Sequence, residues 1–192
     1  MNIMLMGDCD KVDLALVLAL LLQTHRGAPA STVITDRPRH YRYLQDEVSG
    51  VRIQLSGAGS AEGITLYDWH AIELPDVRLD KLYVVSSYDR AALEMAQQAV
   101  RAHADIVSGL IVQESECSIS SRYIAAHLPV QPVFSYYDSP RRRIDWVFDG
   151  RIALKGLEGD FAAAAGSLLQ DIAAIPPREL KKLWTYAKKR GA

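Results

Sequence analysis

The sequence predicts a doubly wound α/β fold, with a mostly parallel sheet that helices cover on both faces. Short apolar runs typical of buried strands alternate with longer segments of helical periodicity along the chain. The first of these runs leads through a glycine turn directly into a long apolar helix. With 192 residues, of which 49% are hydrophobic, the chain is long enough to bury one full core.

The N-terminal stretch forms the first strand-to-helix unit. Residues 2–6 read as an apolar strand, residues 7–10 as a tight acidic turn, and a helix follows from Lys11. Residues 14–22 are continuously apolar, but they are too few to span a bilayer. We therefore expect a buried central helix.

The remaining elements continue the alternation of strand and helix. Strands are expected at residues 31–35, 51–55, 64–68, 81–87, 106–112 and 131–136, and helices at residues 89–104, 118–128, 141–148, 159–173 and 179–190. A short helix is expected within residues 37–46, and a turn at residues 56–63. Pro176 and Pro177 separate the last helix from the body, so we expect an α/β domain of residues 1–175 and a basic amphipathic helix in residues 176–192.

The composition argues against several classes of function. Its 22 basic and 23 acidic residues give a net charge of −1, which does not favour nucleic acid as a partner. Cys9 and Cys117 are far apart in sequence and form neither a disulfide framework nor a zinc motif. We expect reduced thiols, a cytoplasmic protein and no catalytic residues, because no nucleophile and base stand at a recognisable spacing. The thiol of Cys9, which lies between two aspartates, should be hard to ionise.

Five stretches, taken in order, resemble segments of one family of nucleotide-binding proteins: MGDCDKVD at residues 6–13, ITD at 34–36, ITLYD at 64–68, GLIVQ at 109–113 and FSYYDSPRRRIDWVFDGRIAL at 134–154. The chain from residue 2 to about 172 resembles the MinD/ParA group of P-loop ATPases, which carry a deviant Walker A motif. The resemblance implies a P-loop fold with a nucleotide at the first turn. It places Lys11 at the Walker lysine, Asp68 at the Walker B aspartate and Gln113 where an asparagine contacts adenine.

The turn itself departs from the family pattern. Asp8 and Asp10 replace glycines, whose backbone freedom lets N–H groups approach a phosphate closely. Each carboxylate within about 4–6 Å of a triphosphate would cost on the order of 1 kcal/mol or more. Such acids instead cap the start of a helix. We therefore predict a degenerate Walker A motif with no bound nucleotide, cofactor or metal, formed by Gly7, Asp8, Asp10, Lys11, Val12 and Asp13.

Two interpretations of Lys11 and the nearby acids remain open. Lys11 either contacts a phosphate or pairs with an acid among Asp8, Asp10, Asp36 and Asp68, and the acidic surroundings favour pairing. Asp36 and Asp68 would then be remnants of the family's metal and water sites. In the alternative, a divalent metal binds directly to the five acids expected at this edge of the sheet, Asp8, Asp10, Asp13, Asp36 and Asp68. His70 and Glu73 lie near this edge, and His70 is interpreted as a structural residue.

Two surface stretches are candidates for contact with a partner. Arg37, Arg39, Tyr41 and Tyr43 combine residue types that are enriched at protein interfaces, although a solvated segment would show the same pattern. In the tail, Leu180, Leu183 and Trp184 form an apolar stripe flanked by cations that include Lys188 and Lys189. This helix either makes a weak contact with the inner face of the cell membrane or docks on the sheet. Arg141–Arg143 reads as a solvated helix start.

From the resemblance we expect a non-catalytic scaffold or localisation protein that has lost ATP binding. It would act through protein–protein contacts at a pilus, secretion, flagellar or division apparatus. It would form a homodimer through the face at which family members bind nucleotide. One alternative is a divergent active ATPase that uses Lys11, Asp36 and Asp68 and dimerises with nucleotide. The other is a membrane-surface adaptor that uses the C-terminal helix.

Overall fold

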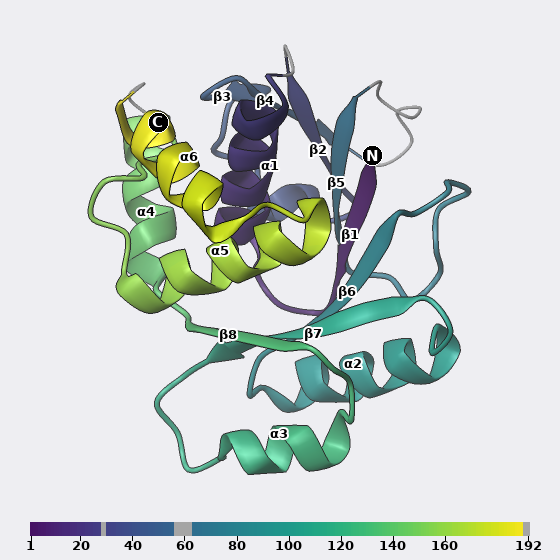
Figure 1. Ribbon diagram of the computed structural model, residues 1–192. Helices are drawn as coiled ribbons and strands as arrows, with labels where there is room; N and C mark the ends of the chain where they lie inside the picture. The colour runs from purple at the N-terminus through teal and green to yellow at the C-terminus, as the bar shows by residue number, and fades with distance from the viewer. Residues whose placement is uncertain (28–29, 56–62, 190–192) are drawn as a thin grey trace.

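One sheet runs through the part of the chain that the computed structural model describes, residues 1–27, 30–55 and 63–189 (Figure 1). Its eight strands have the order β3-β4-β2-β5-β1-β6-β7-β8, and all neighbours are parallel except β3 and β4. The strands are β1 (Asn2–Met6), β2 (Ser31–Thr35), β3 (Glu47–Val48), β4 (Val51–Leu55), β5 (Ile64–Trp69), β6 (Lys81–Ser86), β7 (Val107–Glu114) and β8 (Val133–Tyr137). The predicted α/β class is confirmed.

Helices cover both faces of the sheet, as Figure 1 shows. They are α1 (Val12–Arg26), the 3₁₀ helix η1 (Pro38–His40), α2 (Arg90–Ala102), α3 (Ser121–His127), α4 (Pro140–Asp149), α5 (Gly159–Ala173) and α6 (Pro177–Lys189). Alternate side chains of a strand point to opposite faces. Ile3 and Leu5 of β1 accordingly pack with α1, α4, α5 and α6, whereas Met4 and Met6 pack with α2 and α3.

Helix α1 is the centre of the larger core. Every residue from Val12 to Leu22 is buried, because the sheet lies on one side of the helix and α4, α5 and α6 lie against it as well. The helix ends at Gly27, whose φ of 60° is the left-handed conformation that favours glycine at this position. The expected buried central helix is confirmed.

The structure differs from the sequence-based expectations mainly at short elements. The segment at residues 37–46 holds only the single turn of η1, and β3 is an additional strand. The helix expected at residues 118–128 is shorter, at Ser121–His127. The turn expected at 56–63 falls largely outside the described residues, as does Arg190. Within the described chain, every helix is too short or too polar to cross a membrane.

The carboxyl end of β1 lies between the ends of β5 and β6, where Met6 pairs with Trp69 and with Val84. Gly7 leaves the sheet at this point and donates its N–H to the carbonyl of Trp69 at 2.9 Å. A Cβ at Gly7 would lie 2.0 Å from the carbonyl oxygen of Val85, so only glycine fits here. This close approach holds residues 7–11 against the end of the sheet.

Candidate functional site

Lys11 lies inside the turn that joins β1 to α1. Its Nζ is 2.8 Å from Asp68 Oδ1 and 2.7 Å from the carbonyl oxygen of Gly7, and neither charged side chain is exposed to solvent. Nζ also lies 3.1 Å from His70 Nε2 and 3.3 Å from the carbonyl oxygen of Cys9. Of the four acids considered as partners for Lys11, the structure pairs it with Asp68.

Asp36 does not pair with Lys11 but holds the loop after β5. Its carboxylate accepts the backbone N–H groups of His70 and Ala71 at 2.9 Å and lies 3.0 Å from His70 Nδ1. Burial favours a higher pKa for Asp36, but these hydrogen bonds outweigh it and hold the pKa below its ordinary value. The other ring nitrogen, His70 Nε2, lies 3.1 Å from both Lys11 Nζ and the carbonyl oxygen of Cys9.

The acids at the start of α1 are paired with arginines of α4. The Arg142 guanidinium lies 2.8 Å from Asp13 Oδ2 and 2.6 Å from Glu158, and Arg142 and Asp13 are both buried. Arg143 lies 3.3 Å from Asp10. The interpretation of Arg141–Arg143 as a solvated helix start is therefore wrong for Arg142 and Arg143. The reason is that the fold lays α4 over the acidic turn.

Burial controls the ionisation of two groups in this region. It raises the pKa of the Asp13 carboxyl, and the charges of Arg142 and Arg143 oppose this rise. It also raises the pKa of the Cys9 thiol to about 12. The thiol is hard to ionise, as expected, but burial contributes more to this than the neighbouring aspartates do.

The backbone groups of the turn also have protein partners. Val12 donates its N–H to Asp10 Oδ1 at 3.2 Å, and Leu14 donates to Asp13 Oδ1 at 2.8 Å. The carbonyl of Asp10 accepts the Gln113 side-chain amide at 2.6 Å. Two N–H groups at the start of α1 are thus bound by carboxylates of the chain itself.

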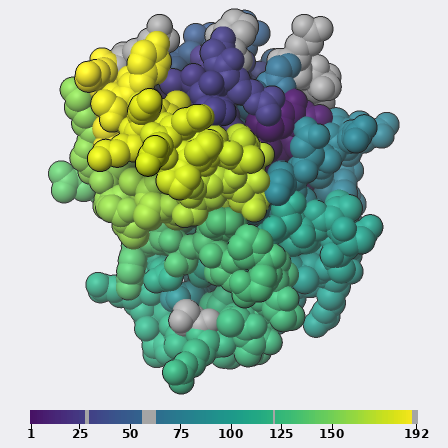
Figure 2. All heavy atoms as spheres, viewed as in Figure 1, coloured from purple at the N-terminus to yellow at the C-terminus, as the bar shows by residue number. Residues whose placement is uncertain are grey.

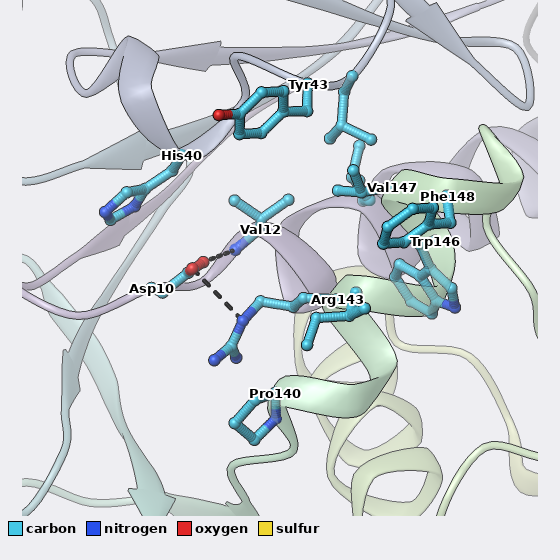
Figure 3. Close-up of a pocket in the computed structure, with 12 residues that line it drawn as sticks. Asp10, Val12, His40, Tyr43, Pro140, Arg143, Trp146, Val147 and Phe148 are labelled. Atoms are coloured by element: carbon cyan, nitrogen blue, oxygen red, sulfur yellow. Dashed lines mark hydrogen bonds and ion pairs between the residues drawn. The ribbon is translucent and has the colours of Figure 1, made fainter.

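A cavity of about 300 Å³ opens beside the turn, between the start of α1, the segment that follows η1, and α4 (Figure 3). Asp10, His40 and Arg143 line it together with the hydroxyl-bearing Tyr43, and the other lining residues are mainly apolar. Figure 3 shows the Asp10 carboxylate bridging the Val12 N–H and the Arg143 guanidinium. Trp146 and Phe148 form part of the α4 wall.

The first stretch proposed to contact a partner, residues 37–43 after β2, lies partly at the surface and partly in the interior. Arg39 and Tyr43 are exposed, and Arg37 pairs with Asp8 at 2.6 Å. Tyr41 is buried and donates its hydroxyl to Asp68 Oδ2 at 2.8 Å, so it is not a surface residue.

The second stretch proposed to contact a partner, helix α6, packs its apolar stripe against the core. Leu183 is buried, and Leu180 and Trp184 are half-buried. The helix docks on α1 and α5 rather than on the sheet. Figure 2 shows the outer side of α6, in yellow, at the protein surface, where Lys181, Lys182 and Lys189 are exposed.

His40, Arg142 and Arg143 take part in this region although the sequence did not point to them. More than a hundred residues separate the two arginines from Asp10 and Asp13, the acids that they bind at the start of α1. The charge run at Arg141–Arg143, close after a strand, was the one signal available, and it did not reveal which of the three arginines would be buried.

The fold matches solved structures of one group of proteins. The chain is similar to a chain of the MinC:MinD cell division protein complex from Aquifex aeolicus, at 11% identity and a TM-score of 0.63, covering 91% of this chain and 97% of that one. The fold is MinD/ParA-like. The MinD cell division protein from Aquifex aeolicus matches at 12% identity and a TM-score of 0.59, covering 91% of this chain and 98% of that one.

A ParA family ATPase from Chlorobium tepidum TLS matches at 11% identity and a TM-score of 0.54, covering 97% of this chain and 96% of that one. No protein-family model and no curated protein sequence matches the chain. At these identities the likeness establishes the fold alone.

Proposed function

We propose that this protein is a non-catalytic MinD/ParA-like scaffold or localisation protein that does not bind ATP and acts through protein–protein contacts at a cellular machine. One observation carries the proposal. Arg142 and Arg143 of α4 pair with Asp13 and Asp10 at the start of α1, where the resemblance places a triphosphate and its magnesium ion. The chain thus supplies both the anions and the cations at this turn.

The residues of the turn do not fit a magnesium nucleotide. The ammonium of Lys11 is held by Asp68 and by the carbonyl of Gly7. Val12 offers no hydroxyl to magnesium, and Asp13 is buried against Arg142. Each carboxylate near a triphosphate would add a repulsion of about 1 kcal/mol or more. Binding would have to take Lys11 from Asp68 and Arg142 from Asp13, which would leave two buried carboxylates without their cations beside the triphosphate.

The face around the cavity supports a role in protein contacts. Tyr43, Ile144 and Phe148 line the cavity, and these residues are 68%, 54% and 86% exposed. Clustered exposed apolar side chains, and aromatic ones above all, are typical of protein interfaces. We propose this face as the contact of a homodimer that forms without nucleotide.

Titration with ATP and magnesium tests the loss of nucleotide binding. Ligand at a hundred times its Kd would stabilise the fold by about 2.7 kcal/mol. For a chain of this size that corresponds to a rise in Tm of about 5–10 °C. We expect no shift and no heat of binding up to millimolar ATP. A clear shift that Lys11→Ala abolishes would refute the proposal and favour the divergent ATPase.

Sedimentation of the purified chain tests the homodimer. We expect a dimer whose dissociation constant does not change with ATP and which Phe148→Ser weakens, because Phe148 is 86% exposed in the single chain. Tyr123→Ser is the control, since Tyr123 is exposed on α3, across the sheet. Equal weakening by both variants, or a monomer at every concentration, would contradict this interface.

A further inference from the structure

Three side chains with metal-binding atoms converge next to Lys11. His40, Asp68 and His70 come from η1, from β5 and from the loop after β5. Each offers one ligand atom, and the three atoms lie within 4.8 Å of one another. His70 Nε2 is 3.8 Å from Asp68 Oδ1, and the rings of His40 and His70 meet edge to face with centroids 5.1 Å apart. Small side-chain rotations bring such atoms to the spacing of ligands around one ion.

Neighbouring side chains hold two of these ligands in place. The Asp36 carboxylate lies 3.0 Å from His70 Nδ1, and donation from this nitrogen would leave the lone pair on Nε2, which lies 3.1 Å from both Lys11 Nζ and the Cys9 carbonyl oxygen. Tyr41 holds the other oxygen of Asp68 at 2.8 Å. A carboxylate behind a metal-binding histidine is the usual arrangement in metal sites, because it fixes the tautomer and the orientation of the ring.

His40 adds an independent observation. Its Nδ1 is buried and has no hydrogen-bond partner among the described residues. Buried polar atoms without a partner are rare and call for an explanation such as a missing ion or water. His40 also lines the cavity of about 300 Å³, which gives an ion a route from solvent.

We propose that His40, Asp68 and His70 bind one divalent transition-metal ion of the zinc type. Two imidazoles and one carboxylate suit zinc, cobalt or nickel, whereas magnesium and calcium prefer oxygen ligands. Three protein ligands leave one coordination position for water or a partner group. This site differs from the five-acid site considered from the sequence, because it uses one of those acids, Asp68, with two histidines. It does not depend on whether the chain binds ATP.

Lys11 is a built-in competitor for this ion. Its ammonium lies 2.8 Å from Asp68 Oδ1 and 3.1 Å from His70 Nε2, the same two atoms that the ion requires. Two cations cannot share these atoms, so binding requires the ammonium to withdraw from them. Removing the positive charge of Lys11 should therefore strengthen metal binding, which a purely structural role for the cluster does not predict.

Titration of the full chain with Co²⁺, followed by its visible absorption, and with Zn²⁺, followed by calorimetry, tests the proposal. We expect one saturable ion per chain and the intense bands of four-coordinate cobalt. His40→Ala should weaken binding at least tenfold, and Lys11→Met should tighten it at least tenfold. His103→Ala is the matched control, because His103 is held elsewhere by the carbonyl of Ile72 at 2.8 Å and should leave the affinity unchanged.

Thermal melting by circular dichroism shows whether each variant is folded, and His40→Gln replaces His40→Ala if the latter is not. Absence of saturable binding in both the natural chain and Lys11→Met would overturn the proposal. So would equal affinity in the natural chain and the His40 variant, since the ion would then be bound by other residues.

Discussion

Replacing Arg142 by alanine tests how the start of α1 is held together. The Arg142 guanidinium lies 2.8 Å from Asp13 Oδ2 and 3.7 Å from the centre of the Phe161 ring. Its removal leaves the Asp13 carboxylate fully buried, with the Arg143 guanidinium 3.8 Å away as a more distant cation. Breaking a buried ion pair from one side costs about 3–5 kcal/mol. We expect Arg142→Ala to lower the free energy of unfolding by that amount, a large part of the ~5–15 kcal/mol of a typical domain.

The loss of unfolding free energy in Arg142→Ala should depend on pH in a defined direction. Burial raises the pKa of Asp13, and without Arg142 it rises further. An acid whose pKa is higher in the folded state favours folding below its unfolded pKa, about 3.9, and loses this contribution as the pH rises through its folded pKa. The deficit of Arg142→Ala should therefore be largest at neutral pH and shrink on acidification.

Urea unfolding followed by tryptophan fluorescence measures these free energies. Arg141→Ala is the matched control on the same helix, since the Arg141 side chain is 88% exposed and pairs with Asp145 at 3.6 Å. Arg141→Ala should lower the free energy of unfolding by less than about 0.5 kcal/mol. The double variant Asp13→Leu with Arg142→Met should recover most of the loss, because it leaves no unpaired buried charge. Equal losses for Arg142→Ala and Arg141→Ala would refute the reasoning.

Two further predictions concern packing. Gly7→Ala places a Cβ 2.0 Å from the carbonyl oxygen of Val85 and should prevent stable folding. Gly159→Ala should leave Tm unchanged or higher, because the new Cβ meets no described atom within 4 Å outside its own helix and chain neighbours. Soluble yield and melting compare the two variants, and equal melting would show that the loop can shift. Leu183 is only 8% exposed, so Leu183→Ala should lower the free energy of unfolding by about 2–3 kcal/mol and speed proteolysis of α6. Lys182→Ala, at the exposed neighbouring position, should do neither, and equal cleavage of both variants would contradict the docking of α6.

The alternation of elements could be predicted because it is a local property. Apolar runs, the glycine turn and the uninterrupted apolar stretch at residues 14–22 place β1 and α1, and the parallel sheet follows from them. The two-residue strand β3 could not be predicted, because it pairs with β4 through Glu47 and Val48 alone and carries no periodicity.

The pairing of charges could not be predicted, because it depends on which elements the fold brings together. Asp13 and Arg142 are 129 residues apart in sequence, and they meet because α4 packs against the start of α1. The sequence predicted that Lys11 pairs with one of four acids, but it could not show that the partner is Asp68. Burial of Tyr41 within a basic, tyrosine-rich segment also had no local signal, since its position follows from its hydroxyl reaching Asp68.

The enclosure of α1 has a consequence for the motions of the molecule. No side chain from Val12 to Leu22 is exposed, and the sheet, α4, α5 and α6 surround the helix. Backbone amides in such an element exchange hydrogen with solvent only when the whole domain opens, whereas peripheral helices exchange through local openings. The slowest-exchanging amides of the chain should therefore lie in α1, and their exchange rate reports the global stability.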